Sequence, residues 1–357
     1  MKTTLDRVLF SIAAVTAAAM TISTSVVAEG IATTNISVIG SSESTNMHKF
    51  VEQPFWTKTV PEGSSGAVVV DFKGLQTSGL KGPEILRLLS TGAITIAHGT
   101  FTTVAADDEI FNGIDLPGLA PTIQTARAIS EAYSPVVADT LRKKHGLKLL
   151  AVLPFTSQVF FCSTPINGLD DLEGKKIRVY GRSLAELVEA AGATPVTIPF
   201  NEVVPALQTG VADCAITGIT AGNTAKWYEV AKYLYNLPTG WAINFYAANA
   251  DAWNALAPEA RRYLETAIDQ MKDDVWAFTA EENQFGVACN TGQDPCQYGV
   301  KADMKLTSLS SEDKEALDRL LLETVIPNWA QRCGAECTRT WNDTVGKVVN
   351  MSLPIPD

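Results

Sequence analysis

The feature that most constrains the fold of this chain is a charged side chain inside a short apolar segment. Ile177-Arg178-Val179-Tyr180 follows a charged turn at 173–176 and ends at Gly181. A short apolar run bounded in this way, with an amphipathic segment directly after it, is typical of a strand in an α/β sheet. An unpaired guanidinium in a dry interior costs several kcal/mol, so Arg178 must be paired or must face a cleft.

Two neighbouring features favour the cleft over a structural ion pair or a solvent-facing edge position. The strand ends within two residues of Arg178, and ligands in open α/β sheets bind outside the carboxyl ends of the strands. The next helix is expected to begin near Arg182, so its N-terminal amides would favour an anion in the same region. The planar donors of a guanidinium suit a carboxylate. The sequence therefore predicts that Arg178 anchors a carboxylate.

Strand and helix patterns alternate along the chain. The expected strands lie at 35–40, 67–72, 93–97, 147–153, 159–162, 196–199 and 214–217. The expected helices include 84–89, a segment from Arg182 to Gly192, 202–209, an unusually long helix over 258–278, and a last helix whose capping box lies at 310–313. This alternation predicts an α/β fold.

The first 28 residues are predicted to be a signal peptide. Two cations precede an apolar core at 8–20, and small residues precede a cleavage point at Glu29. The apolar run is shorter than the roughly 20 residues of a membrane-spanning helix, and two hydroxyl residues interrupt it. We therefore expect export to the periplasm and a mature protein that does not span the membrane.

The charge balance and the absence of common motifs narrow the function further. The chain has 28 Lys and Arg against 39 Asp and Glu, a net charge of −11, which argues against nucleic acid or an anionic membrane surface as partner. An anionic ligand remains compatible, because the chemistry of a pocket is local. The sequence lacks GxSxG, HExxH, P-loop and GxGxxG motifs, so we expect no enzyme. No cofactor and no metal site are expected, although a metal that bridges ligand and protein is left open.

Six cysteines in an exported protein predict disulfides. We expect two local bridges near the C-terminus, with a crossed pairing as the alternative: Cys289–Cys296 and Cys333–Cys337. Cys162 and Cys214 are expected either as buried small side chains or as one further bridge. A zinc site is disfavoured, because none of the three histidines neighbours these cysteines.

Five motifs in order resemble the extracytoplasmic solute-binding subunit of a tripartite ATP-independent periplasmic (TRAP) transporter. They read LEGKKIRV, AAGATPV, PFNEVVPALQTGVAD, KWYEVAKYL and NADAWNALAPEAR. The resemblance is best over 169–267 and covers nearly all of the mature chain. It implies a two-domain periplasmic-binding-protein fold with a central cleft, a hinge and a long helix that spans both domains.

The resemblance also implies the domain boundaries and the function. Domain I is expected at 29–153 with 244–284, and domain II at 154–243 with 285–357. The implied function is the capture of a small organic anion, foremost a carboxylate, and its delivery to a TRAP-type membrane permease. The alternatives are the binding protein of an ATP-driven transporter or sensor and, ranked last, a secreted hydrolase.

Several residues of domain II are candidate ligand contacts. Arg178 matches the arginine that grips the substrate carboxylate in the family, and Phe200 matches an aromatic residue that lines the pocket, with a core role nearly as strong. Arg182 is either a second cation for the ligand or a solvated residue at a helix start. Asn201 is a candidate too, but we expect it to cap the next helix.

The chain departs from the family pattern at two places. The asparagine that often follows the ALQTGVVD motif is missing, so Thr217 or Thr220 would replace it. A second arginine is missing from Thr156-Ser157-Gln158, so recognition by two arginines is not supported. The ligand need not be one of the common dicarboxylates or sialic acid.

Four further candidates are weaker. Gln76, His98 and Thr100 follow predicted strands in domain I and would face the cleft. A lone histidine such as His98 is more often a structural residue than a ligand contact. Trp241 is expected to supply an apolar wall.

Overall fold

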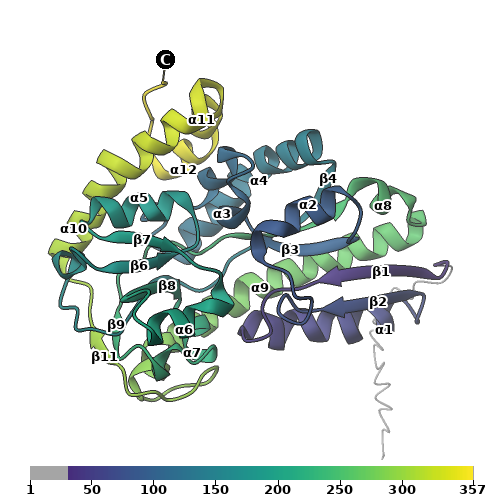
Figure 1. Ribbon diagram of the computed structural model, residues 1–357. Coiled ribbons are helices and arrows are strands. Elements are labelled where there is room, and N and C mark those ends of the chain that lie inside the picture. The colour runs from purple at the N-terminus through teal and green to yellow at the C-terminus, as the bar shows by residue number, and fades with distance from the viewer. Residues whose placement is uncertain (1–30, 357) are drawn as a thin grey trace, which may run out of the picture.

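Two separate sheets organise residues 31–356, the part of the chain that the computed structural model describes (Figure 1). The predicted signal peptide, 1–28, lies outside the described residues. The first sheet has the order β2-β1-β3-β10-β4, and the second has the order β11-β9-β5-β8-β6-β7. We call the first sheet with its covering helices lobe I and the second sheet with its covering helices lobe II. This architecture confirms the predicted α/β fold.

Lobe I combines parallel and antiparallel pairing: β1 pairs in parallel with β2 and β3, whereas β10 lies antiparallel between β3 and β4. Its strands are β1 (Thr34–Ile39), β2 (Val68–Lys73), β3 (Ile96–Thr100), β4 (Leu147–Leu153) and β10 (Asn244–Asn249). The expected strand at 93–97 is therefore placed too early, because Gly92 ends a turn at φ 71° and the strand continues through His98 to Thr100.

Lobe II has a parallel core of three strands, with β6 between β7 and β8, and two antiparallel pairings through β5. Its strands are β5 (Gln158–Cys162), β6 (Lys176–Val179), β7 (Thr194–Thr197), β8 (Cys214–Gly218), β9 (Tyr233–Tyr235) and β11 (Lys305–Thr307). Because β6, β7 and β8 run in the same direction, their carboxyl ends meet at one edge of the sheet. Arg178 lies on β6 near that edge.

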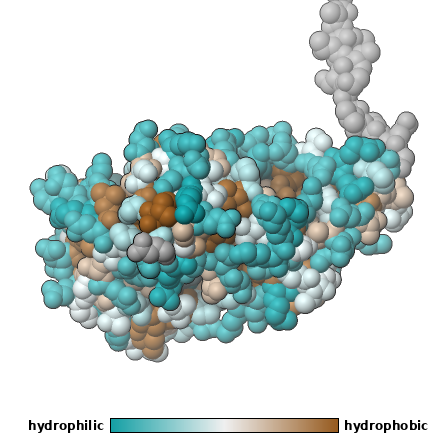
Figure 2. Space-filling view, turned by 90° about the horizontal axis from the view of Figure 1, so that it is seen from above, coloured by the Kyte–Doolittle hydropathy of each residue, from teal (hydrophilic) through white to brown (hydrophobic). Residues whose placement is uncertain are grey.

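Helices cover both sheets (Figure 1). The helices are α1 (Val60–Gly63), α2 (Ile85–Ser90), α3 (Phe101–Val104), α4 (Ile123–His145), α5 (Arg182–Ala190), α6 (Val203–Gln208), α7 (Ile219–Thr224), α8 (Ala250–Ala255), α9 (Pro258–Thr291), α10 (Ser311–Leu320), α11 (Ile326–Trp341) and α12 (Lys347–Val349). Helix α5 confirms the helix expected directly after the Arg178 strand. Within residues 31–356, none of these helices is long and apolar enough to cross a membrane. The face seen in Figure 2 is mostly hydrophilic, with separate hydrophobic spots.

Helix α9 links the two lobes, as the resemblance implied. With 34 residues it is about 50 Å long at 1.5 Å per residue. Its first half packs Leu264 and Ile268 into the core of lobe I. Near its end, Asn290 Nδ2 donates to the Ile219 carbonyl at 2.8 Å in lobe II. It extends beyond the predicted end at 278, to a C-cap at Gly292 in the left-handed region.

The C-terminal helices contact both lobes. In lobe I, Trp329 Nε1 donates to the Glu109 carbonyl at 3.0 Å and Trp341 Nε1 donates to the Gly113 carbonyl at 2.9 Å. In lobe II, the π-helix η8 (Leu321–Val325) packs against α5. The two sheets fall on either side of the expected domain boundaries, but the assignment of the last segment to domain II alone stays a prediction.

Three disulfides connect the six cysteines. The two local bridges, Cys289–Cys296 and Cys333–Cys337, form as predicted. The third joins Cys162 to Cys214, which lie directly opposite each other on the antiparallel strands β5 and β8. The open choice for these two cysteines is therefore resolved as a bridge inside the sheet of lobe II.

The bridge between Cys162 and Cys214 is expected to stabilise lobe II. It closes a loop with a sequence separation of 52 residues, and constraining such a loop in the unfolded chain contributes about 2–4 kcal/mol. Replacing both cysteines by alanine should lower the free energy of unfolding by that amount in urea titrations. The matched control is the double alanine variant of Cys333 and Cys337, whose separation is 4 residues. A larger loss in the control would contradict the prediction.

Glu282 lies where α9 passes between the lobes. The residue is buried, with 4% of its surface exposed. It accepts a hydrogen bond from Asn46 Nδ2 of lobe I at 2.8 Å and hydrogen bonds with Thr220 of lobe II. Burial raises the pKa of Glu282 to about 7, although the two hydrogen bonds lower it in part. Below about pH 7 the protonated carboxyl is therefore favoured at this contact between the lobes.

This raised pKa makes stability depend on pH. A carboxyl whose folded pKa lies above its unfolded value gives full stability below about pH 4.5 and loses it as the pH rises through about 7. Between pH 5 and pH 8 the wild type should lose on the order of 2–3 kcal/mol relative to Glu282→Gln. Urea unfolding of both proteins at the two pH values measures this difference. A difference that does not change with pH would refute the expectation.

Candidate ligand-binding site

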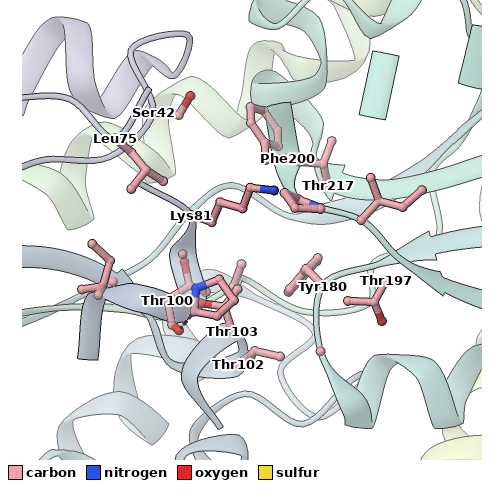
Figure 3. Close-up of a pocket in the computed structure, with 18 of the residues that line it drawn as sticks. Ser42, Leu75, Lys81, Thr100, Thr102, Thr103, Tyr180, Thr197, Phe200 and Thr217 are labelled. Carbon is pink, nitrogen blue, oxygen red and sulfur yellow. Dashed lines mark hydrogen bonds between the residues drawn. The ribbon is translucent and has the colours of Figure 1, made fainter. Parts of the chain in front are cut away.

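A cleft of about 1010 Å³ lies between the lobes. Figure 3 shows residues of lobe I on one side and residues of lobe II on the other. The labelled residues of lobe I are Ser42, Leu75, Lys81, Thr100, Thr102 and Thr103, and those of lobe II are Tyr180, Thr197, Phe200 and Thr217. The carboxyl ends of β3, β6, β7 and β8 all reach this cleft, as the general rule for open α/β sheets predicts.

Arg178 borders the cleft and is 3% exposed. Its Nε donates to the Ile198 carbonyl and its Nη1 donates to the Ile216 carbonyl, each at 2.8 Å. The rings of Tyr180 and Trp227 lie 5.5 and 5.8 Å from the guanidinium carbon. These four contacts come from neighbouring strands and the turn beyond them, and they hold the guanidinium in one orientation.

The charge of Arg178 has no counter-ion among residues 31–356, where its partners are two carbonyls and two aromatic rings. Burial lowers the pKa of Arg178 to about 10, so the guanidinium stays protonated at neutral pH. A structural ion pair, the alternative considered for this residue, is not formed within the described residues. An anion in the cleft would therefore complete the site.

Two other residues of lobe II reach the cleft as expected. Thr217 borders it from the end of β8 and is 5% exposed. Phe200 borders it from the turn η6 (Phe200–Glu202), and its ring lies 5.4 Å from the ring of Trp227. The Phe200 ring therefore packs on the buried ring of Trp227, which also lies beside the Arg178 guanidinium.

Arg182 borders the cleft at the start of α5, but its environment differs from that of Arg178. Its side chain is 67% exposed, and its Nε lies 3.3 Å from Glu186 Oε1. Glu186 also pairs with Arg332 of α11, which in turn pairs with Glu109 at 2.9 Å. Arg182 therefore has a partner already and adds little free positive charge to the deep cleft.

Direct contacts between the lobes close the mouth of the cleft. Gln76 Nε2 of lobe I donates to Asn201 Oδ1 of lobe II at 2.9 Å. Next to it, Lys81 Nζ pairs with Glu202 Oε1 at 2.9 Å. The expectation that Asn201 caps the following helix is wrong, because its side chain reaches across the mouth and α6 has no side-chain cap.

The structure does not bring Thr220 and Trp241 to the cleft. The Thr220 hydroxyl lies 3.1 Å from Thr156 Oγ1 and near Glu282, behind the cleft wall. Trp241 is buried in the core, where its Nε1 donates to the Ala120 carbonyl at 3.0 Å. Neither is among the described residues that border the cleft. A large apolar side chain after a turn fits a core and a cleft wall equally well, which explains the error for Trp241.

The lobe I candidates Gln76, His98 and Thr100 all border the cleft. Thr100 Oγ1 donates to Asn244 Oδ1 at 2.7 Å. His98 is 5% exposed, and its Nδ1 lies 2.8 Å from Glu52 Oε1. The structural role that the sequence favoured for His98 is therefore present at Nδ1, which contacts Glu52.

Several residues of the cleft were missed. Gln158 occupies the segment that lacks the second arginine, and its Nε2 donates to the Thr156 carbonyl at 2.7 Å. Thr102 and Thr103 were missed because they lie on α3, a helix of four residues directly after β3 that was not among the expected helices. Thr102 touches Gly181 so closely that a Cβ at Gly181 would collide with it. A glycine that leaves a strand just before a helix was the available signal for this close approach.

Comparisons with known proteins give a family match and several relatives. Residues 38–326 match the family described as bacterial extracellular solute-binding protein, family 7. The chain is 32% identical over 167 residues to the ectoine-binding periplasmic protein TeaA of Halomonas elongata, which covers 44% of this chain and 48% of TeaA. It is 25% identical over 260 residues to the C4-dicarboxylate-binding periplasmic protein DctP of Rhodobacter capsulatus, covering 72% and 75%. The chain thus spans about half of the first relative and three quarters of the second.

Solved structures share the two-lobed fold. One is DctP6 of Bordetella pertussis, an extracytoplasmic solute receptor binding pyroglutamic acid, with a TM-score of 0.79 and 24% identity over 88% of this chain and 100% of that one. Another is a TRAP periplasmic solute binding protein of Rhodoferax ferrireducens with bound malonate, with a TM-score of 0.77 and 18% identity over 88% and 98%.

The pair across the mouth predicts how charge controls closure. Lys81→Glu places two carboxylates opposite each other, so we expect a shift toward an open form and a several-fold weaker affinity. The charge-swapped double variant, Lys81→Glu with Glu202→Lys, should restore both properties. Spin-label distances between the lobes and ligand titrations report the two effects. Because both side chains are exposed, the difference should shrink at high salt. A single variant that stays as closed as the wild type would contradict this prediction.

Proposed function

Since this chain belongs to family 7 of the bacterial extracellular solute-binding proteins, we propose that it captures a small organic anion in the periplasm and delivers it to a TRAP-type membrane permease. The observation that carries the proposal is Arg178, a buried guanidinium that borders the cleft and has no counter-ion among residues 31–356. The family is one of binding proteins, and we extend this to propose that the ligand is released unchanged.

The chemistry of the cleft favours a carboxylate as the anion. The Arg178 Nε and Nη1 atoms each donate to a carbonyl. The N–H groups of Nη2 have no such partner among residues 31–356 and can donate to an oxygen anion. Hydroxyl side chains such as Thr100, Thr197 and Thr217 add neutral donors and acceptors around it. Relatives and structural neighbours are named for C4-dicarboxylates, pyroglutamic acid and malonate, which supports a small carboxylic acid.

The two lobes give the protein its means of retaining the ligand. In the structure, Arg178 of lobe II and the polar residues of lobe I border the same cleft, and separating the lobes would move them apart. A ligand that contacts both lobes binds the closed form better than the open form, and so it shifts the population toward closure. A permease that distinguishes the closed form from the open one would then receive only loaded protein.

The test of this proposal is the affinity of Arg178→Ala for small carboxylates. We expect the wild type to bind at least one acid in a calorimetric panel of succinate, malonate and pyroglutamate. Truncating a buried hydrogen-bonded charge costs 2 kcal/mol or more, so Arg178→Ala should bind roughly 30-fold or more weakly. Arg178→Lys should also bind weakly, because an ammonium lacks the planar donor set.

Arg182→Ala is the matched control, because it removes an exposed cation that borders the same cleft and already has a carboxylate partner. Its affinity should change only a few-fold. Urea unfolding confirms that each variant is folded. Unchanged affinity in Arg178→Ala would remove the anchor, and binding of neutral solutes alone would overturn the proposed ligand class.

A further inference from the structure

A buried carboxylate lies behind the lobe I wall of the cleft. Glu52 is fully buried at the end of the π-helix η1 (Met47–Glu52). Its Oε2 accepts hydrogen bonds from the Ser41 amide at 2.8 Å and the Ser41 hydroxyl at 2.6 Å. Its Oε1 accepts from the Tyr246 hydroxyl and lies at the same 2.8 Å distance from His98 Nδ1. The carboxylate is therefore fixed from three directions.

This carboxylate is ionised and needs a positive partner. Burial alone raises the pKa of Glu52, but the charge of His98 and hydrogen bonds from His98 and Ser41 lower it to about 2. A buried anion without a cation is costly, and hydrogen bonds compensate only part of that cost. His98 is the nearest group that can carry the positive charge, with its Nδ1–H donating to Glu52.

The second nitrogen of His98 is unsatisfied. Nε2 is buried and has no hydrogen-bond partner among the described residues, while the ring borders the cleft. The ring of Tyr246 packs edge-on at 5.5 Å and the ring of Phe155 lies at 5.7 Å, so the imidazole cannot easily rotate away. Because Nδ1 is committed to Glu52, Nε2 is the atom left for a group in the cleft.

We propose that His98 is a second recognition point for the ligand, and that its Nε2–H donates a hydrogen bond to a ligand oxygen remote from the carboxylate held by Arg178. The inference rests on the proposed function and deepens it. It defines the ligand class as a small carboxylic acid with a second acceptor oxygen, either a carbonyl or a second carboxylate. An ammonium group at that end of the ligand would face a donor and is excluded.

The experiment compares acids that carry a second oxygen group with counterparts of similar size that lack it. Succinate is paired with butyrate, and pyroglutamate is paired with cyclopentanecarboxylate. In His98→Asn the amide nitrogen takes the place of Nδ1 toward Glu52, and the donor toward the cleft is lost. We expect the acid with the second oxygen to bind roughly 10- to 100-fold more weakly to this variant, and its counterpart to change little.

His48→Asn is the matched control. His48 Nδ1 lies 3.7 Å from the same Glu52 carboxylate, but the residue is not among those that border the cleft. Its affinities should stay within a few-fold of those of the wild type. Equal losses for both members of an acid pair, or no loss in His98→Asn, would overturn the role of His98.

A measurement on the wild type alone keeps the inference testable if His98→Asn does not fold. Calorimetric titrations of the wild type with both members of each acid pair measure what the second oxygen group adds to the affinity. We expect the acid with the second oxygen to bind more tightly than its counterpart. Equal affinities for the two members of each pair would overturn the inference.

The outcomes separate the two claims. If the wild type binds a carboxylate through Arg178 but His98→Asn does not alter its selectivity within the acid pairs, the His98 inference fails and the proposed function stands. If the wild type binds no carboxylate at all, both fail.

Discussion

The site depends on one constraint, a guanidinium held inside a parallel sheet by oxygen atoms that carry no full charge. Arg178 on β6 donates to the carbonyls of Ile198 and Ile216, which lie just beyond the end of β7 and within β8. These dipoles orient the charge without neutralising it, and burial is not strong enough to remove its proton at neutral pH. The three strands must therefore end at a place where an anion can approach, and the cleft occupies that place.

The two lobes contribute different kinds of contact to this cleft. Lobe II offers a permanent cation, whereas lobe I offers hydroxyl groups and an imidazole that contacts the Glu52 carboxylate. The ion pair between Lys81 and Glu202 at the mouth is exposed and screened by salt, so it contributes little to the stability of the contact between the lobes. Contacts in the dry part of the cleft act at a lower local dielectric. The contacts of the ligand, rather than the ion pair at the mouth, should therefore set the lifetime of the closed form.

Local patterns in the sequence predicted what is local in the structure. The strand and helix around Arg178, the alternation of elements and the two short disulfide loops all depend on neighbouring residues. The antiparallel strand β10 was not identified, because its partners β3 and β4 lie about a hundred or more residues earlier in the chain. Trp241 was assigned to the cleft because size and hydrophobicity do not distinguish a wall from a core. The two lobes came from the family resemblance and not from periodicity.

For His98, the sequence predicted the structural role of the side chain but not the atom that is left for a ligand. From the sequence a lone histidine indicates a structural role, and Nδ1 does fill one, but its partner Glu52 lies 46 positions away and no local pattern connects the two. The structure shows that this contact occupies Nδ1, whereas Nε2 is buried without a hydrogen-bond partner among the described residues, in a ring that borders the cleft. A buried side chain with one atom satisfied and one atom unsatisfied carries both roles, since the satisfied atom supplies the rigidity that makes the second atom selective.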